Sequence, residues 1–212
     1  MNHKNLILVG GGGHCKSVID VALNAGWTIL GILDVAENVG KKVLDYSIIG
    51  TDEHISEFVH KTQFLVTVGH IKNVELRVKL HEKIVSAGGK LATVFAHDAH
   101  ISNYSEIDQG TIVMHKAIVN AGAKIGMGSI INNLANIEHD AVVGSFCHIS
   151  TGAIVNGGCN IGDKTFIGSG SVVINNISIA TKTIIAAGSV VCNNIVESGT
   201  YAGNPSLIKN NK

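Results

Sequence analysis

The chain has 212 residues, and its 16 Lys and Arg residues balance 16 Asp and Glu residues, so the formal net charge is zero. Without a basic run or a net positive charge, the sequence argues against binding to nucleic acid or to an anionic membrane surface. Glycine is frequent, with 25 residues, whereas proline occurs once and aromatic residues make up 4%. This composition favours a repetitive fold with a narrow interior filled by aliphatic side chains.

The N-terminal part of the chain alternates between strand-like and helix-like segments. Its expected strands are residues 6–9, 28–33 and 64–68, and its expected helices are residues 15–25, 52–60 and 73–88. Apolar side chains recur on one face of the first helix, and Gly26 follows its end. The alternation predicts a small parallel α/β domain of Rossmann type over residues 1–95.

A run of four glycines, residues 10–13, joins the first strand to the first helix. A backbone without side chains allows a phosphate to approach the N-terminus of a helix. Asp34, at the end of the second strand, is placed to accept a hydrogen bond from a ribose or a base. Lys16 and Ser17 stand where a full G-x-G-x-x-G pattern has its third glycine, so a tight turn without a ligand is the alternative. A domain of this length supplies only half of a dinucleotide fold, which favours a mononucleotide or UDP-sized ligand over hydride transfer.

From residue 101 onward, every sixth residue is Ile or Val over sixteen consecutive positions. These positions are Ile101, Ile107, Val113, Val119, Ile125, Ile131, Ile137, Val143, Ile149, Val155, Ile161, Ile167, Val173, Ile179, Ile185 and Val191. A small residue stands two positions before each of them, with Ile177 as the single exception. A period of six fits neither a helix nor a simple alternating strand. It predicts a solenoid over residues 96–212, in which three hexapeptides make one coil and the aliphatic residue points inward.

The spacing of the cysteines and the hydropathy of the chain indicate the cellular compartment in which the protein is expected. Cys15, Cys147, Cys159 and Cys192 show neither CxxC spacing nor a compact framework, so we expect small buried side chains in a reduced compartment. The apolar segment before the glycines is too short for the core of a signal peptide, and no window reaches the length of a membrane span. A cytoplasmic protein without membrane insertion is expected.

Three histidines lie inside the repeat: His115, His139 and His148. His139 comes two positions after an inward-pointing isoleucine, so its side chain is expected to point out of the solenoid. Glu138 and Asp140 flank it. The residues alone leave two interpretations open: a solvated histidine in a turn, or a general base that a carboxylate orients and keeps basic near neutral pH.

Over nearly its whole length the chain resembles the sialic-acid O-acetyltransferase family of sugar O- and N-acetyltransferases. The resemblance rests on the glycine run with His14, on Glu138-His139-Asp140, and on Gly203-Asn204-Pro205 near the C-terminus. Bacterial nucleotide-sugar 4-N-acetyltransferases of the UDP-bacillosamine-precursor type are the most similar members. The resemblance implies a left-handed parallel β-helix of hexapeptide repeats after a Rossmann-like nucleotide-sugar-binding domain. It also implies a homotrimer that binds acetyl-CoA between adjacent β-helices.

The resemblance further implies roles for individual residues. His139 corresponds to the catalytic histidine, Asp140 to a carboxylate beside it, and Gly157 to a backbone N–H that is a candidate oxyanion donor. The implied acetyl-CoA-binding positions are His148, Ser169 and Ala187. The implied nucleotide-sugar-binding positions are Gly12, Gly13, His14, Asp34 and Gly69. Two departures affect the identity of the base and the sugar: Val35 replaces a second acidic residue, and the loop between Gly69 and Arg77 is longer.

The implied reaction is direct acetyl transfer from acetyl-CoA to the 4-amine of a nucleotide-linked 4-amino-4,6-dideoxy sugar, in the biosynthesis of a bacterial surface glycan or glycoprotein. Acetylation of a sialic acid oxygen is an alternative on the same family fold. A metal-dependent hydratase needs three imidazoles, two of them five positions apart, and residues 101–197 contain no such pair. We therefore expect no metal cofactor. A scaffold without catalysis is the remaining alternative.

Overall fold

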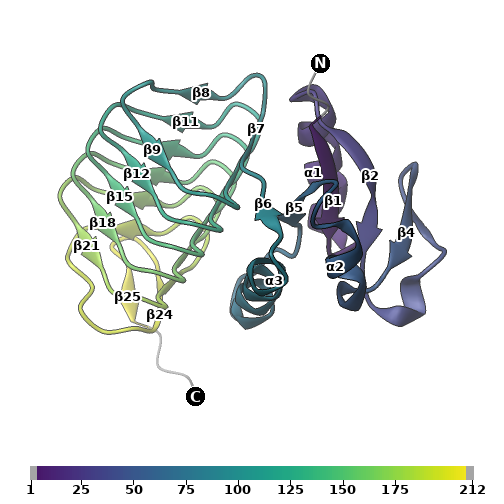
Figure 1. Ribbon diagram of the computed structural model, residues 1–212. Helices are drawn as coiled ribbons and strands as arrows, with labels where there is room; N and C mark the ends of the chain where they lie inside the picture. The colour runs from purple at the N-terminus through teal and green to yellow at the C-terminus, as the bar shows by residue number, and fades with distance from the viewer. Residues whose placement is uncertain (1–3, 209–212) are drawn as a thin grey trace.

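The computed structural model describes residues 4–208 as an α/β domain followed by a β-helix (Figure 1). A six-stranded sheet in the α/β domain has the strand order β3-β4-β2-β1-β5-β6. Its strands are β1 (Asn5–Val9), β2 (Thr28–Leu33), β3 (Lys42–Val43), β4 (Tyr46–Gly50), β5 (Gln63–Val66) and β6 (Lys90–Leu91). The pairs are parallel except for β3 with β4. The helices are α1 (Gly13–Asn24), α2 (Ile55–Phe58) and α3 (Glu75–Ser86), with 3-10 turns η1 (Ala36–Asn38) and η2 (Asp52–His54).

The predicted strands are confirmed by β1, β2 and β5, and the two long predicted helices by α1 and α3. The helix expected over residues 52–60 is shorter, because it begins as the turn η2 and ends at Phe58. The hairpin of β3 and β4 is not predicted by the sequence pattern. Its turn contains Leu44, with a φ of 53°, instead of the Asn-Gly or Asp-Gly pair that signals such turns.

The C-terminal domain is a left-handed β-helix with three sheets, one on each face of a triangular prism (Figure 1). The first, here called the interdomain face, comprises β7 (Val94–Phe95), β10 (Ile112–Val113), β13 (Ile130–Ile131), β16 (His148–Ile149), β19 (Phe166–Ile167), β22 (Ile184–Ile185), β24 (Thr200–Ala202) and β25 (Leu207–Ile208). The second face comprises β8 (His100–Ile101), β11 (Ile118–Val119), β14 (Asn136–Ile137), β17 (Ile154–Val155), β20 (Val172–Val173) and β23 (Val190–Val191). The third face comprises β9 (Glu106–Ile107), β12 (Lys124–Ile125), β15 (Val142–Val143), β18 (Asn160–Ile161) and β21 (Ser178–Ile179).

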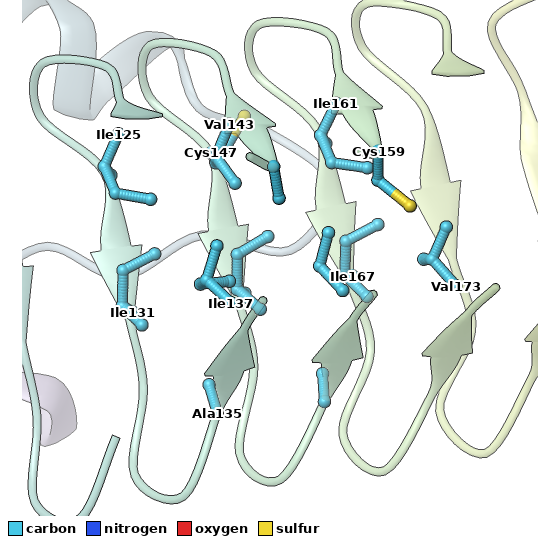
Figure 2. Packing of buried hydrophobic residues seen from close by; sticks show 14 of the residues in the cluster. Ile125, Ile131, Ala135, Ile137, Val143, Cys147, Cys159, Ile161, Ile167 and Val173 are labelled. Carbon is cyan, nitrogen blue, oxygen red and sulfur yellow. The ribbon is translucent and has the colours of Figure 1, made fainter. Parts of the chain in front are cut away.

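The predicted ladder of aliphatic residues forms the interior of the prism. Ile112 pairs with Ile130 and Val113 with Ile131, so one coil takes 18 residues. Figure 2 shows Ile125, Ile131 and Ile137 pointing into the prism, where they are at most 2% exposed. Because each coil covers the apolar side chains of the next, the buried column is continuous and no coil is stable alone.

Most of the small residues lie buried at the corners. Ser129 donates a hydrogen bond to the carbonyl oxygen of Gly144 at 3.0 Å, and Ser171 donates to that of Ala186 at 2.8 Å. A buried hydroxyl group needs such a partner, and the corner supplies one for Thr111, Ser129, Thr165 and Ser171. Ser and Thr can therefore replace Ala at these positions without an unsatisfied polar group.

The corners also require unusual backbone angles. Positive φ values recur every sixth residue from Gly110 to Gly188, and several of these residues are not glycine. Asp140 is one of them, with a φ of 60°. Asp tolerates this left-handed conformation better than most residues, because its short side chain can bond locally.

Both domains contribute to one apolar cluster. Leu6, Leu8 and Val18 of the α/β domain pack with Ile112 and Ile130 of the interdomain face. On the other side of the sheet, residues of α2 and α3 pack over β1, β2 and β5. The α/β sheet therefore lies between α1 with the β-helix on one side and α2 with α3 on the other.

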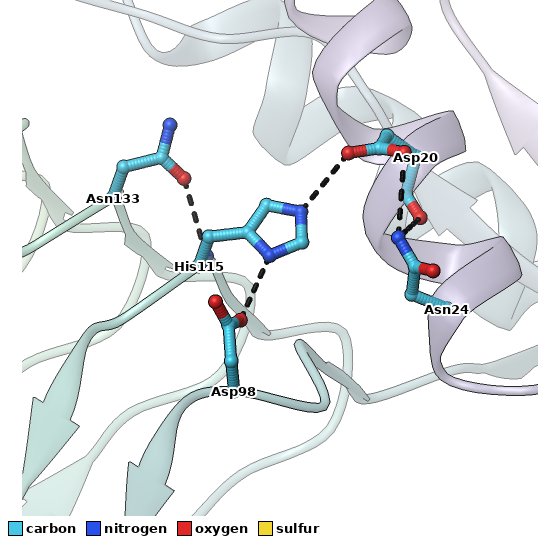
Figure 3. Close-up of polar contacts among 5 residues, drawn as sticks. All are labelled: Asp20, Asn24, Asp98, His115 and Asn133. Carbon is cyan, nitrogen blue, oxygen red and sulfur yellow. Dashed lines mark hydrogen bonds and ion pairs between the residues drawn. The ribbon is translucent and has the colours of Figure 1, made fainter.

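A polar contact adds to this interface (Figure 3). His115, in the turn after β10, donates from Nδ1 to Asp98 at 2.8 Å and from Nε2 to Asp20 of α1 at 3.1 Å. Both acceptors are carboxylates, so the protonated ring can donate to both at once. The hydrogen bond to Asp98, with a smaller contribution from Asp20, raises the pKa of His115.

The remaining predictions concern the ends and the cysteines. β7 already pairs with β10, so the first coil begins just before the predicted domain boundary at residue 96. The segment Gly203-Asn204-Pro205 connects β24 with β25 at the end of the β-helix. All four cysteines are free thiols; Cys15, Cys147 and Cys159 are buried, but the prediction is wrong for Cys192, which is only half-buried. No helix within residues 4–208 is long and apolar enough to cross a membrane.

Candidate active site

A pocket of about 490 Å³ lies where the carboxyl ends of β1, β2 and β5 meet the β-helix. Ligands of open α/β sheets bind at this edge, where the strand order reverses around β1. The residues that line it are Gly10, Gly11, Gly12, Gly13, His14, Asp34, Thr67, Val68, Gly69, His70, Ile71 and His148. The pocket thus brings together all five positions assigned to the nucleotide sugar, and His148 joins them from β16.

The glycine run shapes one wall of this pocket. Gly10 has a φ of 108°, and a Cβ atom there would lie 2.5 Å from the side chain of Val68. A Cβ atom at Gly11 would lie 2.6 Å from Asp34 Oδ2, whereas Gly12 and Gly13 face open space. Helix α1 begins at Gly13 without a side-chain cap and without an acidic residue in its first turn. Its first N–H groups are therefore available to an anionic ligand.

Asp34 is held rigidly beside the glycines. Its Oδ1 accepts a hydrogen bond from the N–H of Val35 at 2.8 Å, and its Oδ2 accepts one from the amide of Asn38 at 3.1 Å. Each carboxylate oxygen has a second lone pair. The half-buried Asp34 can therefore accept a further hydrogen bond from a ligand hydroxyl or N–H group.

Three uncharged histidines form the wall nearest the β-helix. Burial, with smaller contributions from the charge of Arg77 and from His148, lowers the pKa of His14 to about 3. Burial and then His148 and Arg77 lower the pKa of His70 to about 3, and burial lowers that of His148 to about 4. His148 donates from Nδ1 to the carbonyl oxygen of His70 at 2.8 Å. At neutral pH these rings act as neutral donors and acceptors.

Arg77 stabilises the same wall of the pocket through hydrogen bonds to backbone carbonyls. The sequence analysis gave this residue no role. Its guanidinium group is 0% exposed and donates to the carbonyl oxygens of Gly128 at 2.8 Å, Val66 at 2.7 Å and Val68 at 2.9 Å. Burial lowers the pKa of Arg77 to about 9, so it stays charged at neutral pH. The side chain ties the end of β5 to a corner of the β-helix.

A second group of predicted residues lies on the β-helix itself. The exposed His139 donates from Nδ1 to Asp140 Oδ2 at 2.9 Å, which leaves Nε2 free to accept a proton. Glu138 does not pair with this ring, because its two oxygens accept from the amides of Asn120 and Asn136, each at 2.8 Å. Of the two flanking carboxylates, the structure therefore assigns the orienting contact to Asp140.

Gly157 stacks on this histidine one coil later. A Cβ atom at Gly157 would lie 2.6 Å from His139 Nε2. Within residues 4–208, the N–H of Gly157 donates to no other protein group. An imidazole with a free nitrogen therefore lies beside an unoccupied backbone donor, the pair that acyl transfer requires of a base and an oxyanion site.

The other two predicted acetyl-CoA positions lie on a different corner. Ser169 follows β19 and Ala187 follows β22, so both are exposed where the interdomain face turns into the second face. They stack one coil apart. The hydroxyl group of Ser169 lies 2.9 Å from that of Ser150.

The chain is similar to known proteins. The family described as the PglD N-terminal domain matches residues 5–84. A mutant of perosamine N-acetyltransferase from Caulobacter crescentus, solved in complex with CoA and GDP-perosamine, is 30% identical over 98% of this chain and 97% of its own, with a TM-score of 0.91. The acetyltransferase domain of PglB from Neisseria gonorrhoeae FA1090, in complex with acetyl coenzyme A, is 30% identical over 98% of this chain and 100% of its own, with a TM-score of 0.90. The chain belongs to this family of PglD-type N-acetyltransferases. No curated protein matches the chain by sequence.

In one chain of this acetyltransferase the two groups lie apart. His139 and Gly157 occupy the corner between the second and third faces, because β14 and β17 precede them and β15 and β18 follow them. That corner does not border the interdomain face, which carries His148 and the pocket. Within the described residues 4–208, no three His, Cys, Asp or Glu side chains are grouped to hold a metal ion.

Proposed function

We propose that the protein transfers an acetyl group from acetyl-CoA to the 4-amine of a nucleotide-linked 4-amino-4,6-dideoxy sugar. The observation that carries the proposal is the His139 ring, which is fixed through Nδ1 by Asp140 and has a free, exposed Nε2. The Caulobacter and Neisseria relatives were solved with CoA and GDP-perosamine, and with acetyl coenzyme A. A role in the biosynthesis of a bacterial surface glycan or glycoprotein follows from this acceptor class.

The reaction needs one base and one oxyanion donor. The sugar amine attacks the thioester carbonyl carbon while His139 Nε2 takes the proton that the amine loses. The N–H of Gly157 donates to the oxygen of the tetrahedral intermediate. When the C–S bond breaks, the imidazolium returns its proton to the departing thiolate and CoA is released. A positioned base of this kind contributes about 10²–10⁴-fold, and positioning the two substrates supplies much of the rest.

The site is completed by a second copy of the chain. Because His139 lies on a corner away from its own pocket, we propose a homotrimer in which His139 of one protomer faces the pocket of the next. Acetyl-CoA then lies in the groove between the prisms, along Ser169 and Ala187, with His148 on the pocket side. A cytoplasmic location, where acetyl-CoA is available, belongs to the same proposal.

Acceptor assays test the proposal against its alternative. The release of free CoA thiol is measured with UDP-, dTDP- and GDP-linked 4-amino-4,6-dideoxy sugars and with free sialic acid, and the same nucleotide sugars with a 4-hydroxyl group serve as controls. We expect turnover with one of the 4-amino compounds and none with its 4-hydroxyl counterpart. Turnover with sialic acid alone would replace the proposal by O-acetylation.

A further inference from the structure

We propose that His70 determines the specificity for the acceptor, by a hydrogen bond between its imidazole ring and a hydroxyl group of the sugar. This inference rests on the proposed function, because it concerns how the same pocket selects its sugar. Sequence reasoning gave His70 no role. Its position directly after Gly69, in a loop longer than the family resemblance implies, was the available signal.

The His70 ring is buried but has no partner. It is 6% exposed and lines the pocket, and within residues 4–208 neither ring nitrogen has a hydrogen-bond partner. Nε2 of His14, whose side chain packs on Gly69, is buried and unpartnered as well. Buried polar groups almost always find a partner, in the protein or in a ligand. Unpaired nitrogens from two separate elements therefore point to a polar ligand at this end of the pocket.

Contacts on both sides of the interface position His70 and the residues before it. The carbonyl oxygen of His70 accepts from His148 Nδ1 at 2.8 Å, and the two rings lie edge to face at 5.6 Å. Arg77 bonds the carbonyl oxygens of Val66 and Val68 just before the loop. These contacts lower the entropic cost of ordering the segment when a ligand binds.

The place of His70 in the pocket indicates which part of the ligand it meets. Asp34 lies against Gly11, the bare N-terminus of α1 follows at Gly12 and Gly13, and His70 lies at the opposite end beside His148 of the β-helix. A nucleotide sugar laid along this line has its nucleoside at Asp34 and its diphosphate at the helix N-terminus. The sugar ring then reaches His70.

The chemistry of the neutral ring indicates which functional group of the ligand can pair with it. A neutral imidazole has one N–H donor and one acceptor nitrogen, and the pKa of about 3 keeps His70 in that form. A phosphate oxygen only accepts and an ammonium group only donates. A hydroxyl group does both, so it can pair with either nitrogen in either tautomer. The ring is therefore suited to form a hydrogen bond with a hydroxyl group of the sugar.

Kinetics of His70→Phe test this role, since phenylalanine keeps the shape of the ring and removes both nitrogens. We expect the KM for the 4-amino nucleotide sugar that serves as acceptor to rise about 10-fold or more, with the KM for acetyl-CoA and the melting temperature unchanged. Deoxy analogues of the acceptor, each lacking one sugar hydroxyl group, are assayed as well. The analogue without the hydroxyl group that pairs with His70 is expected to have the same KM in wild type and variant. His60→Phe, at an exposed position of the same domain, is the matched control. An unchanged acceptor KM in His70→Phe overturns the proposal.

Binding measured without turnover separates this proposal from the proposed function. The full-length protein, labelled with ¹⁵N in its histidines, is titrated with GDP, UDP and dTDP and then with their 4-amino-4,6-dideoxy sugar conjugates. We expect the imidazole signals of His70, assigned with the Phe variant, to shift with a sugar conjugate and not with the nucleoside diphosphates. A shift caused equally by a diphosphate alone assigns the ring to the phosphates and contradicts the proposal. If a sugar conjugate shifts His70 but is not acetylated, only the proposed function fails; if none shifts His70, this proposal fails whatever the acetylation assay gives.

Discussion

Gly157 lies against the imidazole ring of His139, so closely that a methyl group at position 157 would come within 2.6 Å of Nε2. The two residues are one coil apart, and the stacking of the β-helix brings them together. Asp140 holds the opposite nitrogen of the ring. The ring is thus confined on two sides by elements of one corner, with Nε2 on the side of Gly157.

Replacing His139 by alanine removes the proposed base and leaves the backbone of the corner intact. We expect kcat to fall by about 10²–10⁴-fold, the contribution of a positioned general base. Acetyl-CoA binding, measured by calorimetry, is expected to stay within about twofold, because no contact assigned to acetyl-CoA is removed. His60→Ala, at an exposed position far along the chain, serves as the control. Unchanged turnover would remove His139 from the mechanism.

Gly157→Ala tests the close packing of this pair. Gly157 does not have a positive φ, so alanine brings no backbone strain, but its methyl group collides with the ring. We expect the displaced base to lower kcat by about 10-fold or more, since misplacements near 1 Å cost up to about 10²-fold, while the melting temperature changes little. In Gly199→Ala the nearest atom is 3.3 Å away, and turnover should be normal. Wild-type kcat in Gly157→Ala would show that the ring moves freely.

Asp140 can be removed without a backbone penalty. With its φ of 60°, Asp140→Gly should fold at least as well as wild type, because glycine adopts this conformation freely. The ring loses its acceptor at Nδ1, so we expect kcat to fall about 10-fold or more. Asp140→Asn keeps an oxygen acceptor and should retain more turnover than the glycine variant. Equal activity of the three proteins in steady-state assays would mean that the 2.9 Å contact does not orient the base.

The β-helix could be predicted from the sequence because its repeat is local. Every hexapeptide contains its own inward-pointing residue and its own corner residue. Three hexapeptides make one coil, so the pairing of Ile112 with Ile130, 18 positions later, follows from the sequence. The outward position of His139 followed from the same count. Which of its two neighbours contacts the ring did not follow from the count. Glu138 instead accepts from Asn120, one coil earlier, and from Asn136 in the strand just before it.

The wall of the pocket was less accessible to sequence reasoning. Arg77 donates to the backbone carbonyls of Gly128 and Val66, and the backbone carbonyl of His70 accepts from the ring of His148. A backbone carbonyl acceptor cannot be recognised in a sequence, because almost any residue type provides one. The glycine run and Asp34 could be predicted, because a strand, a tight turn and a helix N-terminus have a recognisable sequence pattern.

Mixing two inactive variants tests whether the site is shared between protomers. His139→Ala lacks the base, and Gly12→Trp fills the pocket from a position that faces open space. In a ring of three protomers with shared sites, roughly a quarter of the sites in an equal mixture combine an intact pocket with an intact base. We therefore expect co-expression of the two variants to restore about that share of wild-type turnover. No activity in co-purified mixed trimers would place each site within a single chain.

His115 of the β-helix domain contacts Asp20 on α1 across the domain interface and Asp98, before β8, within its own domain (Figure 3). Asn24 and Asn133 lie beside these groups (Figure 3), and His97 lines the same pocket as His115. Hydrogen bonds to Asp98 and then Asp20 raise the pKa of His115 in the folded protein above its usual value of 6.5. The stability that it contributes is therefore complete below about pH 6.5 and is lost as the pH rises through the raised value. We expect the melting temperature of wild type to fall over this range more steeply than that of His115→Gln, with His139→Ala behaving like wild type. Parallel curves for wild type and His115→Gln would show that the charged link does not stabilise the interface.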